Sequence, residues 1–287
     1  MCITFFHINP LPRPGLFRLV LVMNRDEVLD RATETAEIKA GILAGRDMTP
    51  GKEGGTWLGV DTVGARVGFL TNIYTGSVEK DAKGRGSLVT NFLSGSKSAG
   101  EYLKDLAEED ALYNPFNLFL FDKPQDSGSG YSAKFYCRGK PNHVVVSEGP
   151  EGLKVSGETN CFGIGNHPPS SPYLKTGFGV EKFREIIKSN VAVETKQELV
   201  DALLELMCSE EKSEPDPQMR KQAGGIDVPY HRAAASLFVK TPTFGTRTQT
   251  VVLIDHDYRL TFVEKNREAR EDGSVQWNTK MEEIIMK

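Results

Sequence analysis

Two runs of strand-forming residues near the start of the chain constrain its fold more than any other feature. Residues 2–8 (CITFFHI) and 17–24 (FRLVLVMN) are rich in aromatic and β-branched side chains, and three prolines lie among residues 9–15. Proline has no amide donor and is disfavoured inside a sheet, so the intervening segment is predicted to turn the chain. If the two runs pair antiparallel, the start of the first lies opposite the end of the second. Cys2 is then predicted to lie beside the polar cluster at residues 24–27 (NRDE).

The composition is that of an ordinary soluble globular protein. The chain has 287 residues, of which 39% are apolar and 26% are charged, which is enough to build a full hydrophobic core. Strand patterns recur from end to end without a low-complexity linker, which favours a single domain over residues 1–287. The formal net charge is −4, with acidic and basic residues mixed, and this argues against nucleic acid as a partner. These features leave the oligomeric state open.

The cysteines and the first apolar run indicate a reducing compartment. Four cysteines lie far apart with no CxxC spacing, a pattern that predicts neither a metal site nor a disulfide framework. The apolar run before Asn24 is too short for a signal peptide or a transmembrane segment. The first 25 residues contain three arginines and no acid, as a mitochondrial transit peptide would, but the strand pattern and the prolines argue against an amphipathic helix. A cytoplasmic protein is the prediction.

The rest of the pattern predicts an α+β protein in which helices cover antiparallel sheets. Residues 28–47 predict one short helix and a loop, and residues 56–72 a second hairpin that returns Asn72 beside Trp57. Gly84-Arg85-Gly86 lacks the spacing of a phosphate loop and is predicted to start a helix. Further strands are predicted at residues 116–121, 131–138, 143–147, 159–165, 233–240, 248–255 and 260–264, helices at 88–93, 99–106, 181–189 and 196–208, and a strand ending in a helix at 275–285.

Cys2 is a candidate nucleophile. Removal of Met1 would give Cys2 a free α-amine with a pKa near 7.7 to 8.0, which is suited to act as an internal base for the sulfur. The positive charge of Arg25 would lower the pKa of the thiol, and Asp26 could hold the ammonium form of the amine. Asn72 and Asn166, at strand ends, could each donate a hydrogen bond to a tetrahedral oxyanion, worth about 3 kcal/mol per donor.

Each of these residues also has a structural interpretation. Cys2 could be a small hydrophobic residue at a strand edge, and residues 25–27 a solvated strand end. Trp57 could anchor the core and form one wall of a ligand site, while Arg247 could protect a sheet edge by its charge. The two asparagines could close turns through side-chain to backbone hydrogen bonds.

Several short motifs together resemble one known family. They are Met1-Cys2-Ile3, residues 24–27 (NRDE), 51–59 (GKEGGTWLG), 70–72 (LTN), 84–86 (GRG), 113–118 (YNPFNL) and 244–248 (FGTRT). In this combination the chain resembles the transport and Golgi organisation protein 2 family, also called the NRDE family. The resemblance implies an N-terminal-nucleophile hydrolase-like fold, a four-layer αββα sandwich of two antiparallel sheets. It also implies roles in haem trafficking, in mitochondrial acyl-lipid or coenzyme A metabolism, and in Golgi organisation and secretion, with mitochondrial and Golgi association, but no settled reaction.

The same fold implies a comparison with bile-salt and penicillin amidases. Their catalytic pattern can be laid onto Cys2, Arg25, Asp26, Asn72, Asn166 and Arg247. In those enzymes the arginine and the aspartate are spaced apart, whereas here they are adjacent. Successive residues of a regular strand point to opposite faces, so a bulge or loop would be needed for Arg25 and Asp26 to face Cys2 together.

Two hypotheses therefore stand side by side. As a carrier, the protein would bind a small amphipathic ligand, haem or acyl-coenzyme A, through Asn24, Arg25, Trp57 and Arg247, with the arginines pairing its acid groups. No cofactor is required, and haem would be cargo. Its axial ligand would be one of the cysteines or His7, His143, His167, His231 or His256. As an enzyme, the protein would be a cysteine amidohydrolase or thioesterase that acts through acyl-Cys2.

Overall fold

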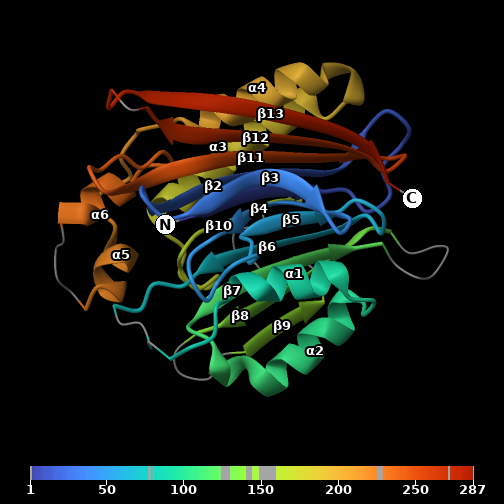
Figure 1. The fold of residues 1–287 in the computed structure, drawn as a ribbon. Coiled ribbons are helices and arrows are strands. Elements are labelled where there is room, and N and C mark those ends of the chain that lie inside the picture. The colour runs from blue at the N-terminus through green and yellow to red at the C-terminus, as the bar shows by residue number, and fades with distance from the viewer. Residues whose placement is uncertain are drawn as a thin grey trace.

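The computed structural model describes most of the chain as an α+β fold of two antiparallel sheets (Figure 1). The described residues are 2–76, 79, 81–123, 130–139, 144–148, 160–224, 229–270 and 272–286, with the side chains of 110, 144–148 and 229 outside the description. The sheets have six and seven strands within these residues.

The six-stranded sheet contains both ends of the described chain. Its strand order is β10-β1-β2-β11-β12-β13. The bounds are β1 (Ile3–Ile8), β2 (Phe17–Val28), β10 (Cys161–Ile164), β11 (Phe244–Asp255), β12 (Arg259–Ala269) and β13 (Val275–Ile285). Ile3 pairs with Asn24, which confirms the predicted first hairpin. β2 does not end at residue 24 but runs through the whole NRDE cluster.

The seven-stranded sheet is built from consecutive hairpins in the order β3 to β9. The bounds are β3 (Thr33–Lys39), β4 (Ile42–Asp47), β5 (Leu58–Asp61), β6 (Arg66–Asn72), β7 (Phe116–Asp122), β8 (Ser132–Arg138) and β9 (Val144–Glu148). The predicted hairpin of β5 and β6 is confirmed, but Leu70 rather than Asn72 lies beside Trp57, because the Leu70 amide donates to the Trp57 carbonyl at 2.8 Å.

Helices cover the outer face of each sheet, as Figure 1 shows. α3 and α4 pack on β1, β2, β10 and β11, and α1 and α2 pack on the strands of the other sheet. The short helices α5 and α6 lie beyond one end of the strands. The bounds are α1 (Gly86–Ser94), α2 (Ala99–Glu109), α3 (Leu174–Asn190), α4 (Lys196–Met207), α5 (Pro217–Gln222) and α6 (Pro229–Ala234). The layer order is therefore helix, sheet, sheet, helix.

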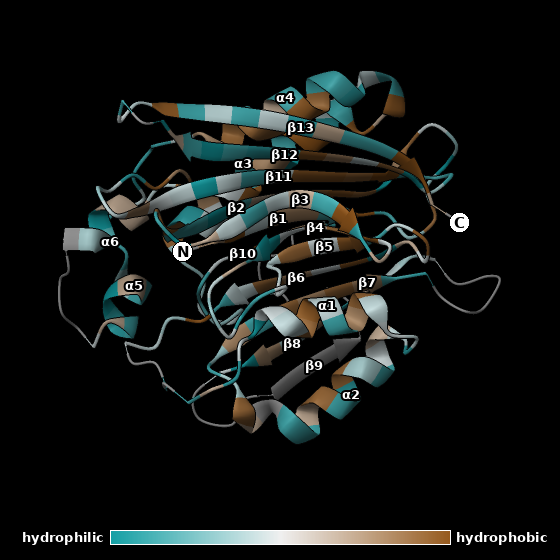
Figure 2. Cartoon of the chain, in the orientation of Figure 1, coloured by the Kyte–Doolittle hydropathy of each residue, from teal (hydrophilic) through white to brown (hydrophobic). Residues whose placement is uncertain are grey.

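The core between the sheets is aromatic. The Phe6 ring on β1 lies 5.9, 5.6 and 5.4 Å from the rings of Phe69, Phe119 and Phe121 on the opposite sheet. Alternate residues of β1 and β2 point the other way and pack under α3 and α4. Figure 2 shows the result: brown apolar residues line much of β5 to β7, whereas β13 is mostly teal or pale with brown near its ends. The two faces of β1 and β2 therefore serve two different cores.

Three predicted segments were wrong, each for a local physical reason. Residues 28–47 form β3 and β4 rather than a helix and a loop; β3 buries only Ala36 fully, so no alternation of apolar residues marks it. Residues 233–240 are not a strand, because the Ser236 hydroxyl bonds to the carbonyls of Ala233 and Phe238 and replaces ladder contacts. The tail is one strand without a helix, since eleven residues pair with β12. Two other predicted strands, at residues 143–147 and 159–165, begin at residues that lie outside the described part of the chain.

Among the described residues, no helix is long and apolar enough to cross a membrane.

Replacing Gly179 with alanine is expected to destabilise the fold. Gly179 lies on α3, where an added Cβ would be 2.1 Å from the Phe5 ring. Because the ring is buried on β1, overpacking should lower the free energy of unfolding by about 1 to 3 kcal/mol. Chemical denaturation of Gly179→Ala measures this loss.

The same helix offers a matched control. A Cβ at Gly177 meets nothing within 4 Å, so Gly177→Ala should be neutral or stabilising by up to about 1 kcal/mol. Equal unfolding midpoints for the two variants would contradict the close contact between α3 and β1.

Candidate functional site

Cys2 lies in a row of candidate residues that crosses three strands. Because Ile3 pairs with Asn24, Cys2 lies opposite Arg25. On its other side Thr4 pairs with Ile164, and the same register carried outward puts Asn166 opposite Cys2. A Cβ on Gly165 would be 3.6 Å from the Cys2 carbonyl oxygen, in agreement with this register. The Cys2 sulfur lies 4.0 Å from the backbone oxygen of Asp26.

Cys2 and Arg25 face the space between the two sheets. Cys2 packs against the aromatic core between the sheets, and the Arg25 guanidinium lies 4.1 Å from the centre of the Trp57 ring. Arg25 is only 4% exposed and Trp57 7% exposed. Stacking on an aromatic face stabilises a cation that has lost most of its water. The Trp57 ring thus stacks on the Arg25 guanidinium and also packs in the core between the sheets.

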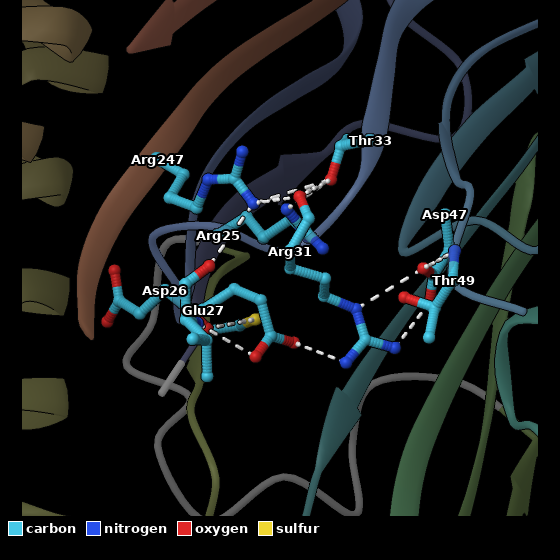
Figure 3. A network of polar contacts seen from close by, with 10 residues as sticks. Arg25, Asp26, Glu27, Arg31, Thr33, Asp47, Thr49 and Arg247 are labelled. Atoms are coloured by element: carbon cyan, nitrogen blue, oxygen red, sulfur yellow. Dashed lines mark hydrogen bonds and ion pairs between the residues drawn. The ribbon is translucent and has the colours of Figure 1, made fainter. Parts of the chain in front are cut away.

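Arg247 reaches the same region through a bulge. The register between β2 and β11 shifts between Thr246 and Thr248, which places a bulge in β11. The bulge that Arg25 and Asp26 would need in order to face Cys2 together is absent from β2, so these two side chains point to opposite faces of the sheet. The Arg247 guanidinium donates to the carbonyl of Arg31, and its Nη1 lies 3.5 Å from the Thr33 hydroxyl. Arg25 approaches the same hydroxyl at 3.5 Å. Figure 3 shows the two guanidiniums side by side near Thr33.

Asn24 points to the other face of the sheet. Its Nδ2 donates to the carbonyls of Met207 and Leu237, at 2.8 and 2.9 Å, and its Oδ1 accepts from Gln249 at 3.2 Å. The side chain is completely buried and ties β2 to the end of α4. The structure does not bring this amide to Cys2, so its predicted ligand contact has no support from the geometry.

Asp26 also faces the helices, where a buried lysine compensates its charge. Its Oδ1 accepts from the Thr246 hydroxyl at 2.7 Å. Burial raises the pKa of Asp26, while the charge of Lys175 and the Thr246 hydrogen bond oppose that rise. Lys175 is 1% exposed in the first turn of α3 and donates to the Ser236 carbonyl at 3.0 Å; burial lowers its pKa. Met1 lies outside the described residues, so the predicted contact of Asp26 with an α-amine stays a prediction.

The two asparagines meet each other. The Asn166 Nδ2 donates to the Asn72 carbonyl at 2.5 Å. This hydrogen bond connects the residues after β10 in the six-stranded sheet to the end of β6 in the seven-stranded sheet. Asn166 is buried, and its Oδ1 has no hydrogen-bond partner within the described part of the chain. One Nδ2 proton of Asn166 is therefore already used, and the predicted role of both amides at an oxyanion stays a prediction.

Arg85 is a site residue that the sequence interpretation missed. Burial lowers its pKa to about 10, and the charge of Cys2 acts in the opposite direction, so the guanidinium lies within electrostatic range of the thiol. Its Nη1 donates to the Pro115 carbonyl at 2.7 Å.

The helix start predicted for 84–86 is confirmed: Gly86 begins α1, and an added Cβ there would be 3.0 Å from Gly55 and Thr56 backbone atoms. The motif Gly84-Arg85-Gly86 is the feature of the sequence that could have pointed to Arg85, because the close approach of Gly86 to Gly55 fixes the position of this arginine.

Three of the four arginines near Cys2 have no acidic partner. Arg31 pairs with Asp47 at 2.5 Å and with Glu27 at 3.7 Å, and Figure 3 shows it between them. Within the described residues, no carboxylate lies within ion-pair distance of Arg25, Arg85 or Arg247. These three residues are named the arginine site below. Burial lowers the pKa of Arg25, and burial followed by the charge of Arg25 lowers that of Arg247. The arginine site is thus partly desolvated, and within the described residues none of its guanidiniums has a carboxylate in ion-pair contact.

A further buried carboxylate stands nearby. Glu264 is 1% exposed on β12, and its Oε1 accepts from the Ala36 amide at 2.6 Å and from Asn266 at 2.7 Å. Burial raises its pKa, while the charge of Arg25 counts among the effects that lower it. Its hydrogen bonds connect β12 with β3, so it contributes a structural contact beside the site.

The histidines proposed as haem ligands lie in different surroundings. Burial lowers the pKa of His167 to about 4, and its ring nitrogens contact Gly165, Pro168 and Thr176. His256 accepts from the Gly15 amide, His7 lies 3.8 Å from Cys161, and His231 lies on α6. His143 lies outside the described residues. In the described part of the chain no group of three or more histidine, cysteine or acidic side chains could hold a metal ion.

Comparison with known proteins identifies the family. The family model described as Transport and Golgi organisation 2 matches residues 1–269. The chain belongs to the Transport and Golgi organisation 2 family. It is 34% identical to the human Transport and Golgi organization protein 2 homolog, over 100% of this chain and 99% of that protein. It is 29% identical to Transport and Golgi organization protein 2 of Drosophila melanogaster, over 97% and 96%. The match to this family covers every residue of the arginine site, whereas the whole of β13 lies beyond it.

Alkylation of Cys2 is expected to be slow at neutral pH. Burial raises the pKa of the thiol above its ordinary value of 9.0, against a lowering by Arg25. The neutral thiol therefore dominates at pH 7, and its reaction with iodoacetamide should accelerate only as the pH rises beyond 9. Peptide mass spectrometry should find exposed Cys208 modified before Cys2.

Arg25→Met should slow the reaction of Cys2 further at pH 9, because it removes a charge that stabilises the thiolate. Arg270→Met, at an exposed position directly after β12, is the matched control and should not change the rate. Faster modification of Cys2 than of Cys208 at pH 7 would contradict the buried, neutral thiol.

Proposed function

We propose that this protein is a carrier that binds an anionic amphipathic ligand at the arginine site. Haem and acyl-coenzyme A are the two cargoes, in keeping with an intracellular role in haem trafficking or acyl-lipid and coenzyme A handling. Such a carrier would support mitochondrial lipid homeostasis, Golgi organisation and secretion, and would act in the cytoplasm with mitochondrial and Golgi association. The family name, Transport and Golgi organisation 2, is consistent with this assignment.

The observation that carries the proposal is the unpaired charge of Arg25, Arg85 and Arg247. Arg25 is buried, and Arg85 and Arg247 are partly buried. A charge that has lost water without gaining a partner is costly, and nearby like charges add to that cost. The described residues contain acidic groups beside Arg31 but none in ion-pair contact with these three arginines. A ligand with two or more negative charges would offset the cost, and guanidinium groups bind carboxylate and phosphate oxygens in pairs.

The two cargoes would use the site differently. An acyl-coenzyme A would place phosphate groups on the guanidiniums, whereas haem would place its propionates there and need a ligand for iron. Cys2 is the side chain of this site with the chemistry to bind iron, as a thiolate. Because burial raises the pKa of that thiol, iron ligation would have to displace its proton, and the acyl-coenzyme A mode requires no such step.

The alternative is a cysteine amidohydrolase or thioesterase on an N-terminal-nucleophile hydrolase-like scaffold. It is favoured by the helix, sheet, sheet, helix order and by the row that joins Cys2, Arg25 and Asn166. The Cys2 thiolate would attack the acyl carbonyl carbon, and collapse of the tetrahedral intermediate would release the thiol or amine. Water would then hydrolyse acyl-Cys2 to the carboxylic acid and free thiol. The raised pKa of the thiol and the occupied Asn166 Nδ2 favour the carrier.

Removing one arginine should weaken the binding of a long-chain acyl-coenzyme A or of haem. A charge-assisted hydrogen bond contributes about 1.5 to 3 kcal/mol, so Arg25→Met, Arg85→Met or Arg247→Met should each raise Kd about tenfold or more. Calorimetry for the acyl-coenzyme A and absorbance for haem measure this change. Arg270→Met is the exposed control and should bind like the native chain. Absence of saturable binding at micromolar concentration for both ligands would reject the carrier.

Cys2→Ser separates the carrier from the enzyme. A carrier should release no coenzyme A from an acyl-coenzyme A, should show no acyl mass on the Cys2 peptide, and should keep its Kd for that ligand after Cys2→Ser. Mass spectrometry and a free-thiol assay report these quantities on protein whose Met1 processing has been checked. An acyl adduct on Cys2 with turnover that disappears in Cys2→Ser would establish the enzyme instead.

A further inference from the structure

A pocket lies on the helix-covered face of the six-stranded sheet. It has a volume of about 420 Å³, within the range of small-molecule sites. Cys208, at the end of α4, and Thr246, whose hydroxyl contacts Asp26, both line it. Since Asp26 and the end of α4 lie on the opposite side of this sheet from Cys2 and Arg25, the pocket opens on the other face from those two residues, although Arg247 lies within electrostatic range of Arg267 in its lining.

Aromatic and aliphatic side chains form a large part of its walls. Phe238, Phe244 and Trp277 line it together with Leu29 and Val275. The rings of Phe238 and Trp277 lie 5.7 Å apart at a tilt of 53°. Side chains of this kind favour an apolar chain or ring that leaves water.

Of the two cations that line the pocket, Lys240 and Arg267, one has no ionic partner within the described residues. Lys240 pairs with Glu210, and both line the pocket. Arg267 lies directly opposite Trp277 in the pairing of β12 with β13 and is half-buried. Within the described residues it has neither an ion pair nor a hydrogen bond. The lining therefore combines an apolar surface with a single positive charge that is free to accept an anion.

We propose that this pocket binds an amphipathic monocarboxylate, with its hydrocarbon chain against Phe238, Phe244 and Trp277 and its carboxylate on Arg267. The charge of Arg267 selects an anion over a neutral or cationic ligand. The half-buried position strengthens the pairing relative to a fully exposed one. This site is additional to the arginine site and does not depend on the carrier function.

Trp277 reports on occupancy directly. The chain has two tryptophans, so in a Trp57→Phe background the fluorescence comes from Trp277 alone. Titration with dodecanoate should give a saturable change with a micromolar Kd, and dodecanol and dodecyltrimethylammonium should bind at least tenfold more weakly. Arg267→Met should raise the Kd for dodecanoate at least tenfold, and the exposed control Arg270→Met should leave it unchanged.

Cys208 gives a second measurement that keeps Trp57 in place. Dodecanoate should slow the modification of Cys208 by N-ethylmaleimide, and peptide mass spectrometry distinguishes this thiol from Cys2. Protection should disappear in Arg267→Met and persist in Arg25→Met.

Three results would overturn the proposal: no saturable fluorescence change together with no protection of Cys208, equal affinity for dodecanoate and dodecanol, or binding that is lost in Arg25→Met but kept in Arg267→Met. The last result would place dodecanoate at the arginine site and leave the carrier function standing, so the two proposals fail separately.

Discussion

The antiparallel pairing of β1 with β2 determines the rest of the site. Because Ile3 pairs with Asn24, Cys2 lies opposite Arg25, and the alternation of side chains sends Arg25 between the sheets but Asn24 and Asp26 towards the helices. Neighbouring residues of the NRDE cluster thus have different roles. Arg25 supplies positive charge near Cys2, whereas Asn24 joins β2 to the end of α4 and to Leu237 through two hydrogen bonds and accepts a third from Gln249 on β11.

The arginine site depends on contacts between distant parts of the chain. The bulge in β11 brings Arg247 to Thr33, and the approach of Gly86 to Gly55 fixes α1 and with it Arg85. The helix face of the same sheet has its own charge balance, in which Lys175 lies buried within range of Asp26. The arginines of the arginine site thus have no carboxylate partner on their face of the sheet, whereas Asp26 on the other face is compensated by Lys175. The arginine site is therefore available to an anionic ligand.

The sequence was sufficient for features that depend on neighbouring residues. The proline-rich turn and the two strand runs predicted the first hairpin, and therefore the meeting of Cys2 with Arg25. It was insufficient where tertiary contacts decide. β3 was missed because Ala36 is its one fully buried residue, and Lys175 was missed because no local pattern marks a lysine that the fold buries. The bulge that would turn Arg25 and Asp26 to the same face is absent from β2; the bulge in β11 positions Arg247 and leaves Asp26 on the helix face.

The most direct measurement is a crystal structure of the protein with a bound long-chain acyl-coenzyme A. The account predicts that phosphate oxygens of the ligand lie within hydrogen-bond distance of at least two of the guanidiniums of Arg25, Arg85 and Arg247. A ligand bound elsewhere, with none of the three guanidiniums contacting it, would contradict the claim that these partly desolvated charges hold an anion.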